Sequence, residues 1–137
     1  MTKMKSFETV YKELEELFIQ KLPDYTEKIN KEYNDGIILK RFENKKLDDN
    51  CIKLPCFCYQ FEKAEYNEKD RIIENTVYDV SFKIKLLQDK KQNVLIFWRY
   101  VKAINRMLAE SEFTDDVREM KIMDVDEEII KMRIVVE

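Results

Sequence analysis

The sequence contains no histidine, one glycine, two prolines and three cysteines. Without histidine, the side chain that usually transfers protons near neutral pH is missing. One glycine is too few for a loop that cradles phosphates with its backbone amides. An odd, small number of cysteines fits a reducing compartment better than a disulfide framework. These scarcities argue against nucleotide-binding loops, histidine-dependent catalysis and a disulfide-stapled fold.

Long hydrophobic runs are also missing. No segment approaches the roughly 20 apolar residues of a membrane span, and the N-terminus has no signal-peptide core. Apolar residues make up 45% of the 137 residues and charged residues 39%, which is enough for a core beneath a highly charged surface. We therefore expect a soluble chain made in a cytoplasm, and one domain spanning residues 1–137.

Residues 78–108 carry the strongest pattern in the chain. Residues 78–86 alternate apolar and polar, which predicts a strand with one buried face. After a polar interruption, the apolar spacing becomes helical, and Asn93 is placed to cap the helix. The apolar stripe predicted for this helix consists of Val94, Phe97, Trp98, Val101, Ile104 and Leu108. A strand followed by an amphipathic helix predicts a helix packed on a sheet.

An amphipathic helix is also predicted at the N-terminus. Ser6 is its expected cap, and the helix is expected to end at Leu22-Pro23 because the residue before proline avoids helical geometry. Its apolar stripe consists of Phe7, Val10, Tyr11, Leu14, Leu17 and Phe18, and Lys12, Glu13, Glu15 and Glu16 are expected to face water. A second helical piece, residues 24–33, is expected to begin at Pro23 and to stop at Asn34-Asp35-Gly36.

The remaining segments predict strands and loops. Residues 37–39 are predicted to begin a short strand, and 56–61 as a strand for which Pro55 indicates either an edge position or the strand start. Residues 41–50 are predicted as a loop, and 62–71 as either a loop or a mobile hairpin tip before the central strand. Residues 117–125 and 129–136 are predicted as two strands that form a closing hairpin. The expected class is α+β: a small, mostly antiparallel sheet packed against an N-terminal helix and a second long helix, with a β-hairpin at the C-terminus.

Three groups of residues are candidates for a chemical site. Cys51, Cys56 and Cys58 lack the fourth ligand that zinc requires, so we interpret them as small buried hydrophobic residues. The carboxylate pairs fall in predicted loops, where acids are normally solvated; they are Asp48-Asp49, Asp115-Asp116 and Glu127-Glu128. Trp98-Arg99-Tyr100 and the basic pairs do not form a nucleic-acid track, since the chain is acidic and Trp98 lies on the predicted buried stripe. We expect no catalytic residue, cofactor, metal or specific nucleic-acid sequence.

Charge is distributed unevenly along the chain. Residues 110–137 contain ten acidic and four basic residues, a net of -6, which leaves +3 for residues 1–109 of a chain whose total is -3. Such an asymmetry either favours association of copies or reflects a solvated acidic face. Tyr59, Phe61 and Tyr66 border a charged segment and either cover the edge of the core or form part of a partner surface.

Several local patterns resemble the small tail-terminator (tail-completion) proteins of contractile and long-tailed phages and of phage-derived particles. The resemblance rests on Leu22-Pro23-Asp24-Tyr25, the stretch from Ile29 to Gly36, the strand ending at residues 78–86, the sequence Arg99-Tyr100-Val101-Lys102-Ala103-Ile104 in a helix, and the closing strand pair. It covers most of the chain as a pattern of residue types and spacing. Residues 62–71 match nothing in that family and are either an arm onto the neighbouring subunit or a mobile turn.

The resemblance implies a non-enzymatic virion protein, assembled in the bacterial host cytoplasm, that forms a hexameric ring. Such a ring caps the tail tube and joins the tail to the neck or head connector. Its implied partners are copies of itself, tube and possibly sheath proteins, and a neck or connector protein, with no membrane. Candidate contact residues are Arg41, Lys45, Lys46, Tyr59, Phe61, Tyr66 and Arg71. The alternatives are another neck protein, such as a head–tail connector or stopper, and a small adaptor or immunity-type binding protein.

Overall fold

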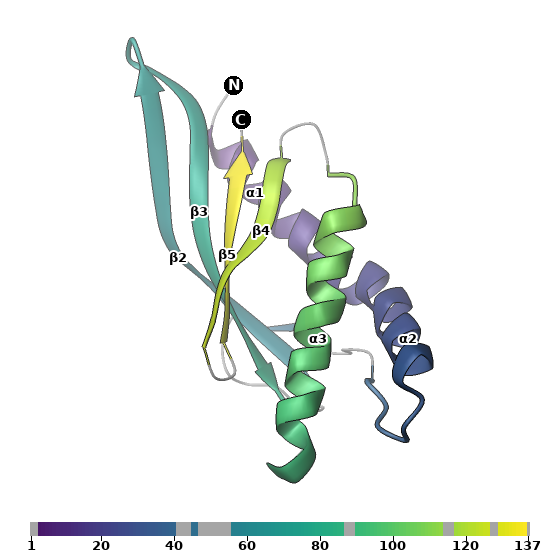
Figure 1. The fold of residues 1–137 in the computed structure, drawn as a ribbon. Coiled ribbons are helices and arrows are strands. Elements are labelled where there is room, and N and C mark those ends of the chain that lie inside the picture. The colour runs from purple at the N-terminus through teal and green to yellow at the C-terminus, as the bar shows by residue number, and fades with distance from the viewer. Residues whose placement is uncertain are drawn as a thin grey trace.

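Two layers make up the computed structural model, which describes residues 3–40, 45–46, 56–86, 90–113, 117–126 and 129–136. One layer is a five-stranded sheet, and the helices lie against one of its faces (Figure 1). The elements in chain order are α1 (Lys3–Glu16), η1 (Leu17–Lys21), α2 (Leu22–Tyr33), β1 (Lys45–Lys46), β2 (Cys56–Lys69), β3 (Ile72–Lys85), α3 (Lys90–Glu110), β4 (Val117–Asp126) and β5 (Ile129–Val136). The predicted α+β class and its element order are confirmed.

The N-terminal helical segment continues past the point where it was expected to end. Between α1 and α2 lies η1, a π-helical turn in which the Leu22 N–H donates to the Leu17 carbonyl. The predicted stop at Leu22-Pro23 is therefore wrong: Pro23 lies in the first turn of α2, and Lys21 and Leu22 before it keep right-handed helical geometry. Ser6 is not a cap either, because α1 begins before it, at Lys3.

The stripe on the N-terminal helices is largely as predicted. Val10, Leu14, Leu17 and Phe18 are buried, and Tyr11 is partly buried, while the side chain of Phe7 lies outside the described residues. Glu13 was expected to face water but is buried. The reason is that α1 packs against β4 and β5, so its buried stripe is wider than the apolar pattern.

The chain leaves α2 through two left-handed residues. Asn34 (φ 44°) is the C-cap, and its N–H donates to the Asn30 carbonyl at 3.0 Å; Gly36 follows with φ 86°. Residues 37–39 form no strand, contrary to the prediction. Instead, the Asn30 side chain binds both backbone groups of Leu39, accepting from its N–H at 2.8 Å and donating to its carbonyl at 3.0 Å.

The sheet has the strand order β1-β2-β3-β5-β4. Its centre is β3, which pairs antiparallel with both β2 and β5. The predicted alternation holds there, because Tyr78, Val80, Phe82 and Ile84 are all buried. Phe82 stacks on Phe18 of η1 with ring centroids 4.4 Å apart. This contact joins the two layers at the middle of the core.

Of the two predictions for residues 62–71, the loop is wrong and the hairpin is confirmed. These residues belong to a long hairpin in which β2 and β3 pair to their ends at Lys69 and Ile72 around the turn residues Asp70 and Arg71. A bulge places Glu62 as an extra residue on β2 between the pairs Phe61–Val80 and Lys63–Asp79. The bulge shifts the inward-facing positions from Tyr59 and Phe61 to Ala64 and Tyr66. This change of phase is why the sequence appeared to have no period here.

Two further predictions on this side of the sheet change. Lys45 and Lys46, placed in a loop from sequence, form β1 and pair parallel with Phe57 and Cys58 of β2. The rest of the predicted loop at 41–50 lies outside the described residues. The predicted closing hairpin is confirmed as β4 and β5, and Ile130, Met132, Ile134 and Val136 of β5 are buried.

The long helix α3 begins three residues before the predicted cap, so Asn93 lies inside the helix and does not cap it. Its buried face consists of Phe97, Tyr100, Ala103, Ile104, Met107 and Leu108. Val94 and Trp98 were predicted on that face but are 65% and 53% exposed. Residues 94–98 are all apolar, so the sequence fits several stripes, and packing against the sheet selects the one centred on Tyr100 and Ile104.

Candidate functional site

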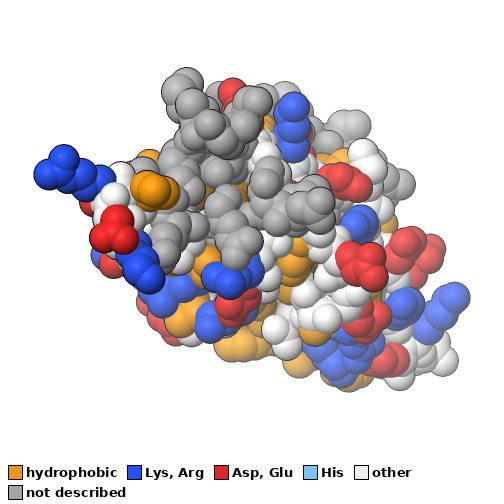
Figure 2. Space-filling view, turned by 90° about the horizontal axis from the view of Figure 1, so that it is seen from above, with side chains coloured by type: hydrophobic (Ala, Val, Ile, Leu, Met, Phe, Trp, Pro, Cys, Tyr) orange, Lys and Arg blue, Asp and Glu red, His pale blue; other side chains and the backbone are white. Residues whose placement is uncertain are grey.

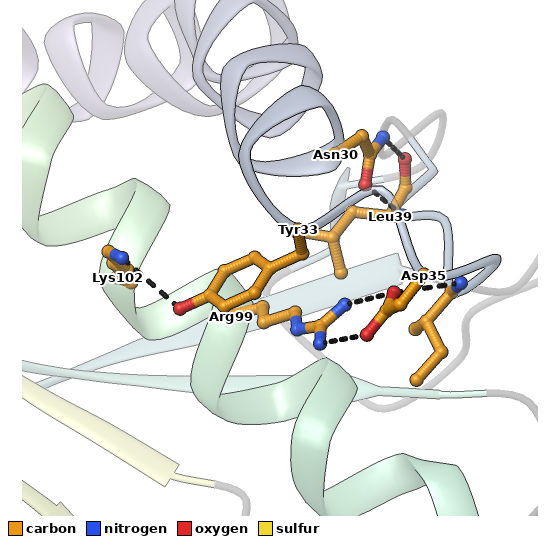
Figure 3. A network of polar contacts seen from close by, with 7 residues as sticks. Asn30, Tyr33, Asp35, Leu39, Arg99 and Lys102 are labelled. Atoms are coloured by element: carbon orange, nitrogen blue, oxygen red, sulfur yellow. Dashed lines mark hydrogen bonds and ion pairs between the residues drawn. The ribbon is translucent and has the colours of Figure 1, made fainter.

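A network of polar side chains connects α2, the segment after it and α3, and we call it the α2–α3 clamp (Figure 3). It consists of Glu32, Tyr33, Asp35, Arg99, Lys102 and Arg106. Arg99, a nearly buried residue of α3, donates to both carboxylate oxygens of Asp35 at 3.0 and 2.6 Å. The guanidinium also lies 4.0 Å from the centre of the Tyr33 ring. Bidentate pairing and ring stacking are the two geometries that favour arginine over lysine.

The clamp continues along α3 at the spacing of one helical face. Lys102 donates to the Tyr33 hydroxyl at 3.1 Å and lies 3.5 Å from Glu32. Arg106 donates to Glu32 at 2.8 Å. Arg99, Lys102 and Arg106 thus hold the C-terminal end of α2 against α3.

Electrostatics in the clamp follow from these contacts. The hydrogen bonds from Arg99 lower the pKa of Asp35 from 3.8 to about 2. The hydrogen bond from Arg106 likewise lowers the pKa of Glu32, and the one to Asp35 raises the pKa of Arg99. Each charge is stabilised by a partner within the chain, so the arrangement suits a fixed joint rather than proton transfer.

Tyr100 extends the joint into the core. Its hydroxyl donates to the Lys40 carbonyl at 2.6 Å and accepts from the Lys40 N–H at 3.1 Å. Burial raises the pKa of this phenol, which therefore stays protonated and able to donate. The backbone N–H and carbonyl groups of both Leu39 and Lys40 are therefore hydrogen-bonded to side chains of α2 and α3.

The far part of the β2–β3 hairpin is the first exposed surface of interest, and we call residues 62–75 the ribbon. The last pair of β3 with β5 is Thr76–Val136, so only the outer part of the ribbon, residues 67–75, extends past β5. Residues 63–66 pair with residues 76–79 of β3, which still pair with β5. The ribbon projects from the sheet in Figure 1, and its end forms the left extremity of Figure 2, where basic and acidic side chains lie together. Tyr66 and Ile72 on it are 51% and 68% exposed.

A second exposed surface lies on the first half of α3. Val94, Leu95 and Trp98, which we call the α3 patch, are each at least half exposed. Val94 and Trp98 are one turn apart, and the Trp98 ring contacts the buried Phe97 edge-on at 5.8 Å. The sequence pattern did not indicate this surface, because Val94 and Trp98 fit the apolar stripe predicted for the core.

The predicted contact residues divide into three groups. Arg41 lies outside the described residues, and of Lys45 and Lys46 only the backbone is described. Tyr59 is buried and Phe61 is packed against the core, so of the two interpretations left open, these two residues follow the core one. Tyr66 and Arg71 are exposed on the ribbon.

The described residues also bear on metal binding and on membrane spanning. Among the described residues, no group of three or more potential histidine, cysteine or carboxylate ligands is close enough to hold a metal ion. Cys51 and the side chains of Cys56 and Cys58 lie outside that part of the chain. None of the described helices combines the length and apolar character needed to cross a membrane.

Comparison with known proteins adds no family to this picture. No protein-family model matches the chain, and no curated protein matches it.

Proposed function

We propose that this chain is a structural virion protein of the tail-terminator kind, a subunit of a ring that caps the tail tube and joins the tail to the neck. Two observations support the proposal. The α+β fold with its closing hairpin is the one that the sequence resemblance implies. The observation that carries it is the ribbon, whose outer part, residues 67–75, is a two-stranded arm past β5, with Ile72 exposed on it and Tyr66 exposed at its base.

An arm of this kind suits assembly for a physical reason. A two-stranded hairpin is only marginally stable in water unless it packs against another surface. Beyond Thr76 the described part of the chain adds no third strand to the ribbon, since the last described pair with β5 is there. A neighbouring subunit or the tube end would supply that surface. The mechanism is binding alone: the ring occludes the growing end of the tube and presents a new surface to the neck.

The test combines size and location. Light scattering should find a ring-sized oligomer, either alone or after addition of tail tubes, and negative-stain images should place it at tube ends. Paired substitutions Tyr66→Ser and Ile72→Ser should reduce binding to tube ends or to neighbouring copies while leaving the melting temperature nearly unchanged, since both side chains are exposed. Absence from tube ends in every condition would contradict the proposal.

The alternative classes give different results in the same experiment. Another neck protein would bind the connector ring rather than the tube end. An adaptor or immunity-type protein would remain a monomer and form a one-to-one complex, for which the acidic residues 110–137 are the candidate surface.

A further inference from the structure

The α3 patch is an unusual surface for a chain with so much charge. Val94, Leu95 and Trp98 place three large apolar side chains next to one another in solvent, and Phe97 anchors one edge of the Trp98 ring. Contiguous exposed apolar groups mark contact surfaces, and a tryptophan held in place by its neighbours is the residue type that most often dominates binding energy.

The charge around the patch restricts what can bind there. The α3 sequence contains five basic residues, and its one acid, Glu110, is the last residue of the helix. Arg99, Lys102 and Arg106 are paired within the α2–α3 clamp, and the first two residues of the helix, Lys90 and Lys91, have side chains outside the described part of the structure. The N-terminal end of a helix also carries a partial positive charge. A partner should therefore combine apolar and acidic groups.

The same chain presents such a surface at the end of β4, residues 123–126. Met123 is the extra residue of a bulge between the pairs Ile122–Met132 and Asp124–Lys131, and it is 47% exposed. Asp124 and Asp126 are exposed beside it, within the part of the chain that carries a net charge of -6. The bulge distorts the strand edge and so disfavours pairing with another strand, which leaves side-chain contact as the way to bind.

The two surfaces lie on different parts of the subunit. In Figure 1, the start of α3 and the end of β4 both lie in the lower part of the fold, laterally apart. A closed ring brings two different surfaces of neighbouring copies together, so surfaces that lie apart on one subunit can meet across its interface.

We propose that the α3 patch of one copy docks on residues 123–126 of the next copy, with Trp98 against Met123 and the N-terminal end of α3, which the helix dipole makes partly positive, towards Asp124 and Asp126. The inference deepens the proposed function and rests on it for the identity of the partner, a second copy of this chain. The contact is heterologous: each copy contributes the patch on one flank and the β4 segment on the other.

Complementation between two defective variants tests the contact. Trp98→Glu removes the patch, and the double variant Asp124→Lys/Asp126→Lys removes the β4 surface; each should weaken self-association by at least about tenfold. Leu95→Glu is a second patch variant. Matched controls are Gln20→Glu and Glu16→Lys/Glu27→Lys, which change the same charges at exposed positions of the N-terminal helices. Circular dichroism and melting curves should show all variants folded.

Mixing the two defective variants gives the decisive result. Each mixed pair retains one intact patch and one intact β4 surface, so analytical ultracentrifugation should detect dimers that grow no further. If both variants associate like the wild type, or the mixture stays monomeric while the wild type assembles, the contact is wrong and the proposed ring survives. If the wild type stops at a dimer that both variants weaken, the pairing of the two surfaces is right, but it is made twice about a two-fold axis and the ring is wrong. A wild type that is monomeric with and without tail tubes overturns both.

Discussion

Arg99 and Asp35 lie 64 residues apart in the sequence and form a bidentate pair, in which the two terminal guanidinium nitrogens donate to the two carboxylate oxygens at 3.0 and 2.6 Å. Asp35 also accepts from the Ile37 N–H at 3.2 Å. The pair thus fixes the turn after α2 to the middle of α3, next to the exposed Trp98. It makes the geometry of the α3 patch depend on α2.

The Asp35 carboxylate predicts an acid-dependent loss of stability. Its folded-state pKa of about 2 lies below the ordinary value of 3.8, so the folded chain binds this proton less readily than the unfolded chain. The stabilisation is therefore complete above about pH 5 and disappears as the pH falls through 4 towards 2. Asp35→Asn should lower the melting temperature at pH 7, and the difference from wild type should close towards pH 2. The measurement is a series of thermal melts across this range.

A control variant and a contrary result define this prediction. Glu27→Gln removes a carboxylate from an exposed site of α2 and should leave the melting temperature nearly unchanged at every pH. A gap between Asp35→Asn and wild type that stays constant down to pH 2 would show that the Asp35 carboxylate does not stabilise the fold through its charge.

The aromatic contact between the layers predicts a large loss of stability. Phe82 is fully buried and lies 4.4 Å from Phe18 and 5.4 Å from Tyr59, centroid to centroid. Phe82→Ala should cost about 3–5 kcal/mol of unfolding free energy, because it leaves a cavity. Trp98→Ala should change it by no more than about 0.5 kcal/mol, since that ring is half exposed. Urea unfolding of the monomer measures both; a larger loss for Trp98→Ala would mean that Trp98 belongs to the core.

Trp98 also shows where sequence patterns stop being informative. In β3 the alternation has one solution, so the burial of Phe82 and its neighbours was predictable. Residues 94–98 are apolar without a break, and several helical stripes satisfy them equally. Only the position of the sheet beneath α3 decides which side chains are covered.

Other features were hidden for different physical reasons. The bulge at Glu62 exchanges the inward- and outward-facing positions of β2. The apolar alternation therefore stops at Phe61 in the sequence, although the strand continues. The α2–α3 clamp joins residues that lie far apart in the sequence. No local pattern therefore marks Asp35 as the partner of Arg99. By contrast, helix termination at residues 34–36 was predictable, because Asn and Gly tolerate left-handed geometry.

A buried hydroxyl on β3 predicts a stabilising substitution. Thr76 is fully buried, and its hydroxyl has no hydrogen-bond partner in the described structure. Thr76→Val keeps the shape and removes the unpaired polar group, so it should raise the unfolding free energy by about 1 kcal/mol. The matched control is Thr26→Val on α2, where the hydroxyl donates to the Pro23 carbonyl at 2.9 Å and the change should lower stability. Urea titration compares the two; destabilisation by both would mean that the Thr76 hydroxyl is paired after all.

The left-handed turn of the ribbon predicts that two substitutions in the turn can make the ribbon more ordered. Asp70 and Arg71 have φ of 55° and 68°, so both central residues of this two-residue turn are left-handed, the geometry that Asn-Gly favours. Asp70→Asn with Arg71→Gly should relieve about 1 kcal/mol of backbone strain. Because the turn closes the ribbon, amide hydrogen exchange should slow mainly at residues 62–75.

The control is a substitution that should add backbone strain at a left-handed residue instead of relieving it. Gly36 also has φ of 86°, and a Cβ there would meet no atom within 4 Å, so Gly36→Ala tests backbone strain without a clash. It should lower stability by about 1 kcal/mol. If the Asn-Gly ribbon exchanges no more slowly than wild type while Gly36→Ala destabilises as expected, strain at Asp70 and Arg71 does not limit the ribbon. If the ribbon is a docking arm, the more ordered Asn-Gly variant should also bind tube ends or neighbouring copies more tightly, because less ordering entropy is lost on binding.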